Sequence, residues 1–232
     1  IAYDATVVVV HPKNEWIKEI TVEELKKIWE PSAQGKVTKW NQINPKWPDQ
    51  TFKLFGAGSD SGTFDYFTEA IVGKAKASRG DYTASEDDNT LVQGVSQEKN
   101  AIGYIPMAYY MGNTAKLKAV GIITKDKKGK VLPGVLPSRK TVEDGSYQPL
   151  ARPLFIYISQ KALNKPEVKE YANFFMKNVA TLVPSVQYIP LPAAAYELAT
   201  KNLNSAKLGT VFDGHSEVGL KIEDLLKKES KH

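Results

Sequence analysis

Residues 51–71 have the sequence TFKLFGAGSDSGTFDYFTEAI. The first five of them are predicted to form a strand. The spacing of Phe64, Phe67 and Ile71 (i, i+3, i+7) indicates a helix with one buried face. The segment between them, Gly56 to Thr63, consists almost entirely of small residues. The chain is therefore predicted to run from a strand through a short loop into a helix.

The loop before this helix has the composition of an oxyanion site. The first turn of a helix leaves backbone N–H groups unpaired and carries the positive end of the helix dipole. Gly62 lets the backbone approach a ligand closely, while the hydroxyls of Ser61 and Thr63 add donors that stay protonated near neutral pH. Ser59 is a further candidate. The same residues also fit a plain turn in which Ser61 or Thr63 only caps the helix, and the local sequence leaves both interpretations open.

The rest of the chain alternates between predicted strands and helices. Ala5 to Val10 is predicted to be a strand buried on both faces, as in a parallel sheet. Thr21 to Glu24 is a capping box that starts a helix. This alternation favours an α/β protein with mostly parallel sheets, whose ligands bind beyond the carboxyl ends of the strands. Further strands are expected at Ala101–Tyr110 and Leu154–Ile158, and further helices after Asn89, after Pro166 (with Val168, Tyr171, Phe174 and Phe175 on one face), after Pro192 and around Ile222–Leu226.

The composition is that of a globular protein, because 42% of the 232 residues are hydrophobic and 25% are charged. The absence of cysteine excludes thiol catalysis, disulfides and thiolate metal sites. A net charge of +5 slightly favours anionic partners. Only three of the 31 cationic side chains are arginines, Arg79, Arg139 and Arg152, and only these can make forked contacts to an oxyanion. No apolar run approaches the roughly 20 residues of a membrane helix.

Several chemistries do not fit the residues around Ser61. The loop glycines do not form G-x-G-x-x-G and no Gly-Lys-Ser/Thr follows, which disfavours nucleotide sites. A serine-hydrolase elbow needs glycines where this chain has Ser59 and Thr63. The acidic run Glu86 to Asp88 is assigned to a helix N-terminus rather than to a metal. No basic stripe or RNP-like motif is present, so we predict no cofactor, no metal and no nucleic-acid partner.

The loop and several other stretches of the chain resemble those of the phosphate-binding substrate-capture proteins of bacterial ABC transporters, the PstS-like family. The resemblance implies a type II periplasmic-binding-protein fold, with two lobes of mostly parallel sheets and a phosphate in the cleft between them. It also implies a binding protein rather than an enzyme, located in the periplasm or outside the cell, with or without a membrane anchor, that delivers phosphate to an ABC-transporter permease. The matching stretches, which span nearly the whole chain in the family's order, are Ala2–Ala5 with Val7–Val10, Gly35–Trp40, Asp60–Thr63, Ser85–Asn89, Ala101–Tyr104 and Pro149–Leu154.

By this resemblance Ser61, Gly62 and Thr63 bind phosphate, with Ser59 and Asp60 as neighbouring candidates. The nearest alternative is a receptor for another oxyanion such as sulfate or molybdate. A carboxylate in the cleft repels sulfate but accepts a hydrogen bond from hydrogen phosphate. Asp60 is adjacent to the loop, although the resemblance implies that the main aspartate lies in a first-lobe segment outside this sequence.

The source of a cationic contact is a departure from the family. Its members commonly have an arginine four residues before the serine, where this chain has Ala57. We take Arg79 as the candidate, since it lies in the polar segment after the same helix and is one of three arginines. The alternative is a solvated surface arginine beside Asp81.

A second departure is that the family's N-terminal first-lobe segment has no counterpart here. We expect residues 1–10 to be a crossover strand between the lobes, residues 11–115 to be the complete second lobe, and residues 116–232 to hold the returning strand and the C-terminal part of the first lobe. The absent part would comprise two or three βαβ units of ~30 residues each. We expect it either in a separate chain or removed from this one.

Two further function classes are weaker alternatives. A phosphoester hydrolase using Ser61 as nucleophile lacks an evident base or metal set. An adhesion or scaffold role would use the aromatic loop from Lys39 to Trp47, whose tryptophans look exposed in the sequence.

Overall fold

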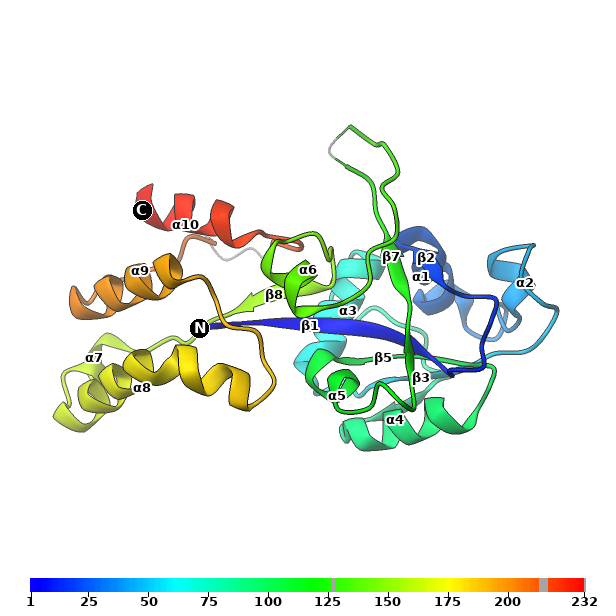
Figure 1. The fold of residues 1–232 in the computed structure, drawn as a ribbon, viewed down its shortest axis with the longest axis horizontal. Helices are drawn as coiled ribbons and strands as arrows, with labels where there is room; N and C mark the ends of the chain where they lie inside the picture. Colours follow the sequence, from blue (N-terminus) through cyan, green and yellow to red (C-terminus); the bar gives the residue numbers. More distant parts are fainter. Residues whose placement is uncertain (127, 213–216, 232) are drawn as a thin grey trace.

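The computed structural model describes residues 1–126, 128–212 and 217–231. These residues form a larger and a smaller body, and the long strand β1 runs from one to the other (Figure 1). The main sheet has the order β4-β3-β5-β1-β6, with β8 also pairing with β1, and β2 and β7 form a separate parallel pair. The strands are β1 (Ala2–Val10), β2 (Glu19–Thr21), β3 (Lys53–Ala57), β4 (Thr83–Ser85), β5 (Ala101–Pro106), β6 (Lys118–Ala119), β7 (Gly121–Ile123) and β8 (Ala151–Leu154).

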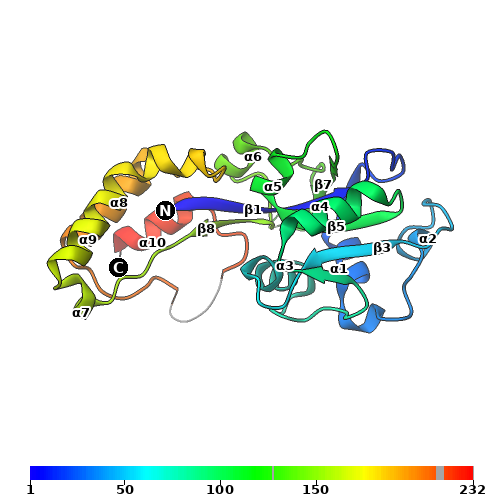
Figure 2. The ribbon, with the colours of Figure 1, turned by 90° about the horizontal axis from the view of Figure 1, so that it is seen from below.

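Helices surround the main sheet and make up most of the smaller body (Figure 2). The α/β class predicted from the alternation of elements is confirmed. The helices are α1 (Val22–Trp29), the 3₁₀ turn η1 (Pro31–Ala33), α2 (Trp40–Ile43), α3 (Gly62–Val72), α4 (Asp88–Gln97), α5 (Met107–Met111), α6 (Arg139–Glu143), α7 (Gln160–Leu163), α8 (Pro166–Ser185), α9 (Ala193–Asn204) and α10 (Ile222–Lys231).

Strand β1 lies at the centre of the molecule. All nine of its residues are buried, as the β-branched run Val7–Val10 predicts. Its first half pairs with β8 and its second half pairs with β5 and β6, and all three pairings are antiparallel. The prediction of a parallel strand was therefore wrong. Burial on both faces is common to central strands of either kind, so the run itself does not reveal direction.

The larger body is held together by an aromatic core. Phe67 of α3 stacks on Tyr104 of β5 at 3.8 Å between ring centroids. Trp29 of α1 meets both rings edge-on, at 5.6 Å and 4.9 Å. Such contacts add to the burial of large apolar area. They hold α3 against the parallel strands β3 and β5, and hence position its N-terminus relative to the sheet.

The smaller body has a second, separate core between β1, α8 and α9. It contains Ala2, Met176, Val179, Val183 and Tyr196. The predicted helix after Pro166 is confirmed as α8, and of the four residues predicted to share one of its faces, Phe175 packs against this core. Tyr171 and Phe174 are 67% and 59% exposed.

Helix α10 returns to the larger core. Its residues Ile222 and Leu225 are buried there, together with Tyr3 of β1 and Val142 of α6. The C-terminal helix therefore packs beside the strands that connect the two bodies.

Other predicted elements agree in position but differ in extent. The capping box at Thr21 is present, with Glu24 N–H donating to Thr21 Oγ1. Pro106 ends the strand predicted for residues 101–110, and α5 follows. Strand β8 precedes the predicted strand and overlaps it only at Leu154.

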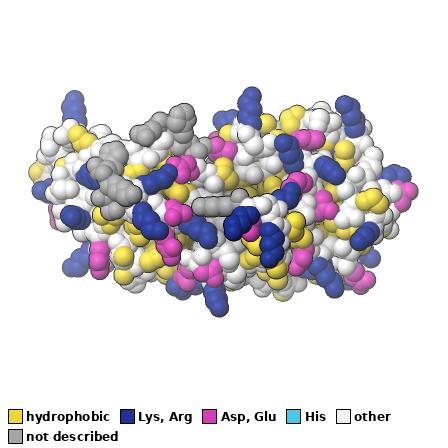
Figure 3. Space-filling view, turned by 90° about the horizontal axis from the view of Figure 1, so that it is seen from above, with side chains coloured by type: hydrophobic (Ala, Val, Ile, Leu, Met, Phe, Trp, Pro, Cys, Tyr) yellow, Lys and Arg dark blue, Asp and Glu magenta, His cyan; other side chains and the backbone are white. Residues whose placement is uncertain are grey.

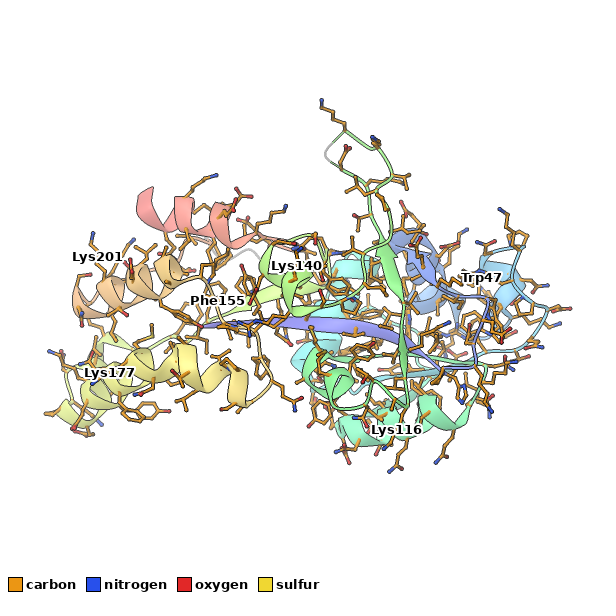
Figure 4. The ribbon with its side chains drawn as sticks, in the orientation of Figure 1. Trp47, Lys116, Lys140, Phe155, Lys177 and Lys201 are labelled. Carbon is orange, nitrogen blue, oxygen red and sulfur yellow. The ribbon has the colours of Figure 1, made fainter. Side chains whose placement is uncertain are left out.

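The aromatic loop is packed rather than exposed. Trp40 is fully buried, and Trp47 packs edge-on against it at 5.9 Å between ring centroids (Figure 4). The adhesion or scaffold alternative therefore loses the exposed aromatic surface on which it depended. Among the described residues, no helix has both the length and the apolar character that crossing a bilayer requires.

Candidate functional site

Ser61 is the N-cap of α3, at the end of the loop that follows β3. Its Oγ accepts a hydrogen bond from Thr63 N–H at 3.1 Å. The predicted capping role is confirmed, yet it does not use the hydroxyl hydrogen of Ser61, which remains available as a donor. The helix starts at Gly62, so its first-turn amides have no acceptor within the helix. Thr63 is buried, whereas Ser59, Asp60 and Gly62 are exposed.

The loop is fixed from one side by Glu86. Its Oε1 accepts a hydrogen bond from Asp60 N–H at 3.2 Å. A Cβ added at Gly58 would lie 2.0 Å from the same oxygen, so glycine at this position leaves room for the Glu86 side chain. Ser61 N–H also donates to Gly58 O at 3.1 Å, which closes the turn. The loop conformation is therefore set before any ligand binds.

Arg152 of β8 is the cationic side chain that lies at this loop. Its Nη1 donates to Gly62 O at 3.1 Å, while its Nε and Nη2 donate to Asp4 Oδ2 at 3.2 and 3.0 Å. Arg152 and Asp4 are direct cross-strand partners in the β1–β8 pairing. Its guanidinium also lies 4.9 Å from the centroid of the Tyr66 ring. The arginine is therefore oriented by a carboxylate and a ring, as a bidentate anion ligand needs to be.

Tyr66 ties the helix to the strand that carries Arg152. Its hydroxyl donates to Pro149 O at 2.7 Å and to Ala151 O at 2.9 Å. Burial raises the pKa of Tyr66 to about 12, so it stays a donor at all ordinary pH values. Gly62 and Tyr66 are one helical turn apart on α3, so the tyrosine holds β8 beside the start of the helix.

Arg79 has other partners, which contradicts its predicted place as the cation of the loop. It is 3% exposed and donates to both Asp81 carboxylate oxygens, with its Nε–H donating to Asp81 Oδ1 at 2.5 Å. Its Nη1 donates to Ile28 O and Val37 O. The alternative of a solvated surface arginine was wrong as well, although the pairing with Asp81 was anticipated. Arg79 joins α1 to neighbouring loops.

Carboxylates lie near the arginine on the α4 side. Burial, together with the charges of Asp87, Asp4 and Glu86, raises the pKa of Asp88 to about 6. Asp88 is therefore largely ionised at neutral pH and close enough to Asp4 for their charges to interact. The site combines neutral donors and one arginine with carboxylates.

Among the described residues, no histidine lies at this loop to serve as the base of the hydrolase alternative. His11 lies at the opposite end of β1, where its Nδ1 accepts a hydrogen bond from Lys13 N–H. The other two histidines, His215 and His232, lie outside the described residues. Within the described ranges no group of three His, Cys, Asp or Glu side chains has the arrangement of a metal site. On the face seen in Figure 3, Lys and Arg side chains alternate with acidic ones rather than forming a stripe.

A family model described as a PBP superfamily domain matches residues 1–179. The chain belongs to this family. It is 52% identical over 231 residues to protein SphX of Synechocystis, covering 99% of this chain and 67% of the relative. It is 35% identical to the phosphate-binding protein PstS of Staphylococcus haemolyticus, covering 88% of this chain and 60% of that protein. The resemblance inferred from the sequence motifs is confirmed.

Solved structures agree with this family. A possible phosphate-binding protein from Planctomyces limnophilus matches at 45% identity with a TM-score of 0.77, over 90% of this chain and 72% of that one. A substrate-binding protein from Clostridium perfringens with bound phosphate shares the fold at 23% identity, with a TM-score of 0.62, over 82% of this chain and 70% of that one. The two-lobed fold class is therefore confirmed. The chain spans 67%, 66% and 60% of the first three curated relatives.

Sequence reasoning missed Arg152, Asp4 and Tyr66. A signal for the first two was present, because both lie in stretches that carry the family resemblance and Arg152 is one of only three arginines. Their proximity to Gly62 depends on the β1–β8 pairing, which brings together residues about 90 and 150 positions apart. Nothing in the sequence marked Tyr66 as part of the site, apart from its position in the helix that follows the loop.

Proposed function

We propose that the chain is the greater part of a receptor that binds inorganic phosphate between two lobes and passes it to an ABC-transporter permease. The observation that carries the proposal is Arg152, held by Asp4 at the opening turn of α3. The names of the relatives point to the same ligand. By analogy with them, the receptor acts in the periplasm or outside the cell and catalyses no reaction.

The phosphate is proposed to lie over the N-terminus of α3. Its oxygens accept from Gly62 N–H at the first turn and from the hydroxyls of Ser61 and Thr63, whereas Thr63 N–H already donates to Ser61 Oγ. Arg152 has five N–H donors, of which three are used by Asp4 and Gly62 in the described part of the chain. The remaining two are available to the anion. Arg152 thereby replaces the contact that Ala57 cannot supply, and Ser59 and Asp60 are proposed to lie at the edge of the site.

The carboxylates are proposed to select phosphate over sulfate. Hydrogen phosphate carries a proton that an ionised carboxylate can accept, whereas sulfate carries none near neutral pH. Asp88, ionised above a pKa of about 6, and Asp4 supply that negative charge, with Asp60 adjacent. Sulfate would meet repulsion without a compensating hydrogen bond.

The first lobe is proposed to be completed by a further segment or a separate chain. Phe155, Ile156 and Tyr157 continue beyond β8 and are 39%, 43% and 72% exposed. They border a cavity of about 320 Å³ between that segment and helices α8 and α9. Exposed apolar residues at the end of a strand, beside an apolar cavity, suit strands added from elsewhere.

The lobe division is proposed with one adjustment. Residues 11–115 form most of the larger body, but β6 and β7 pair with β1 and β2 of the same body. Val135 pairs in turn with Ile122 of β7, so the returning part of the chain is proposed to begin after Val135 rather than at residue 116.

The test is a titration followed by backbone amide NMR. Phosphate is expected to shift the amide signals of Gly62 and Thr63 strongly, and equimolar sulfate is expected to shift them much less. Ser61→Ala should weaken the phosphate response, whereas Ser96→Ala, at a serine of α4 that is half-buried like Ser61, should not. Equal responses to both anions would favour a general oxyanion receptor. Unchanged signals at saturating phosphate would refute the proposal.

A further inference from the structure

A β-hairpin, described for residues 122–126 and 128–135, projects from the larger body, away from the proposed phosphate site (Figure 1). Its arms are joined by paired hydrogen bonds between Ile122 and Val135 at 2.9 and 3.0 Å. Leu132 N–H also donates to Thr124 O at 2.8 Å. Long exposed hairpins are uncommon without a partner, because they bury little of their own surface.

The end of the hairpin is rich in lysine, and the carboxylate of Asp126 accepts backbone hydrogen bonds there. One oxygen of Asp126 accepts from the backbone N–H groups of Lys128 and Lys130, at 2.8 and 2.9 Å. This carboxylate holds the turn in shape and keeps its negative charge, but residues 125–130 contain four lysines and one aspartate, so positive charge is in excess there. Both lysines are exposed, and neither has an ion-pair partner within the described ranges.

Apolar side chains follow the lysines directly. Val131 is 58% exposed and Leu132 is 38% exposed. Adjacent residues on a strand point to opposite faces, so apolar surface is present on both sides of the hairpin. We define the hairpin tip as Lys128, Lys130, Val131 and Leu132. Figure 3 looks onto the side from which the hairpin projects and shows cationic side chains beside hydrophobic ones there.

We propose that the hairpin tip docks onto the surface of an anionic lipid bilayer. Lysine presents a point charge on a flexible stem, which suits a fluid layer of headgroups better than one fixed carboxylate. The apolar pair suits shallow insertion below those headgroups. A groove on a protein partner would cover one face of the hairpin, whereas a bilayer that the tip enters end-on surrounds both faces. The charge and the two-sided apolar surface together favour the lipid.

The experiment is co-flotation of the chain with lipid vesicles. Flotation is expected with equal parts of phosphatidylcholine and phosphatidylglycerol and not with phosphatidylcholine alone, and added salt should weaken it. Lys128→Glu with Lys130→Glu should reduce binding about tenfold or more, since each cation near an anionic surface contributes several-fold. Val131→Ser with Leu132→Ser should reduce binding while leaving its salt dependence.

The matched control carries the same charge change elsewhere. Lys177→Glu with Lys201→Glu places it on α8 and α9, at the far end of the molecule from the hairpin (Figure 4). This variant should bind as the wild type does. A loss equal to that of the hairpin variant would show attraction by net charge alone and would overturn the proposal.

A second readout does not depend on charge reversal. The chain has no cysteine, so Val131→Cys provides a single site for an environment-sensitive dye. Its emission should shift to the blue on phosphatidylglycerol vesicles, whereas the dye at Lys177→Cys should not respond. No flotation together with no shift would overturn the proposal and leave a protein partner for the hairpin.

Discussion

Replacing Arg152 with alanine removes the guanidinium that faces the opening turn of α3. A charge-assisted hydrogen bond contributes about 1.5–3 kcal/mol, so phosphate affinity should fall roughly 10- to 150-fold in calorimetric titration. Arg152→Lys should restore only part of the phosphate affinity, because lysine lacks the planar guanidinium that can donate to Asp4 and to the anion at the same time. The control is Arg139→Ala, which removes an exposed arginine paired with Glu143. Equal losses in both alanine variants would refute the assignment.

Asp81 makes stability depend on pH through Arg79. The hydrogen bond from Arg79 lowers the pKa of Asp81 from 3.8 to about 2. Its contribution to the free energy of unfolding is therefore present above pH 3.8 and is lost as the pH falls toward about 2. Urea denaturation should show Asp81→Asn less stable than the wild type at neutral pH, with the difference shrinking across that window. Asp49→Asn, at an exposed pair with Lys39, should show little such change. A difference that persists at pH 2 would contradict this account.

The sequence predicted the neutral donors proposed for the site but not the proposed cation. Ser61, Gly62 and Thr63 are consecutive, and a strand-loop-helix pattern places them at a helix start regardless of the rest of the fold. Arg79 and Arg152 are equally plausible partners in the sequence. Only the β1–β8 pairing decides between them, and local patterns carry no information about that pairing.

Among the elements, strands and helices with strong local signals were predicted well. Capping residues and the period of apolar side chains determine α1 and α3 locally. Helix α8 shows the limit of this reasoning. Its aromatic residues Tyr171 and Phe174 were predicted to share one face with Val168 and Phe175, but they are exposed, and the buried residues include Met176, Val179 and Val183. The sequence of a helix does not specify which neighbouring element covers each apolar residue. A segment that completes the first lobe, as proposed above, could cover Tyr171 and Phe174.

Helix α10 is predicted to stabilise the junction between the two bodies. Leu225→Ala removes a side chain that is 4% exposed within the main core and should cost about 2–5 kcal/mol. Leu208→Ala, at a leucine that is 58% exposed, is the matched control and should cost little. Chemical denaturation of both variants measures the difference. Equal costs would show that α10 rests loosely on the molecule.

Strands β1 and β8 connect the larger body to the smaller one. The two strands run between the bodies side by side, and the Asp4–Arg152 pair lies on them (Figure 2). An anion bound to Arg152 therefore contacts both α3 of one body and a strand leading to the other. Hinge closure around a ligand needs such a bridge, because a ligand shifts an equilibrium only through contacts that differ between the open and closed states.

The segment that follows β8 allows a test of the proposal that further strands complete the first lobe. In the described part of the chain, the backbone N–H groups of Ile156, Tyr157 and Ile158 donate no hydrogen bond. Their amides should therefore exchange with solvent rapidly in the 232-residue chain. In a protein whose first lobe is complete, added strands would pair with this edge and slow the exchange by orders of magnitude.

Strand β5 is the internal reference for hydrogen exchange measured by mass spectrometry. Ile102 and Tyr104 pair with β1 and should be protected in both forms. Slow exchange at residues 156–158 in the 232-residue chain would mean that this edge is already covered, and the first lobe would then need no added strands. If residues 156–158 are protected from exchange only in the completed protein, the apolar edge and its cavity are the surface to which the rest of the first lobe binds. Phosphate closure, which needs two rigid lobes, should then be seen only in that form.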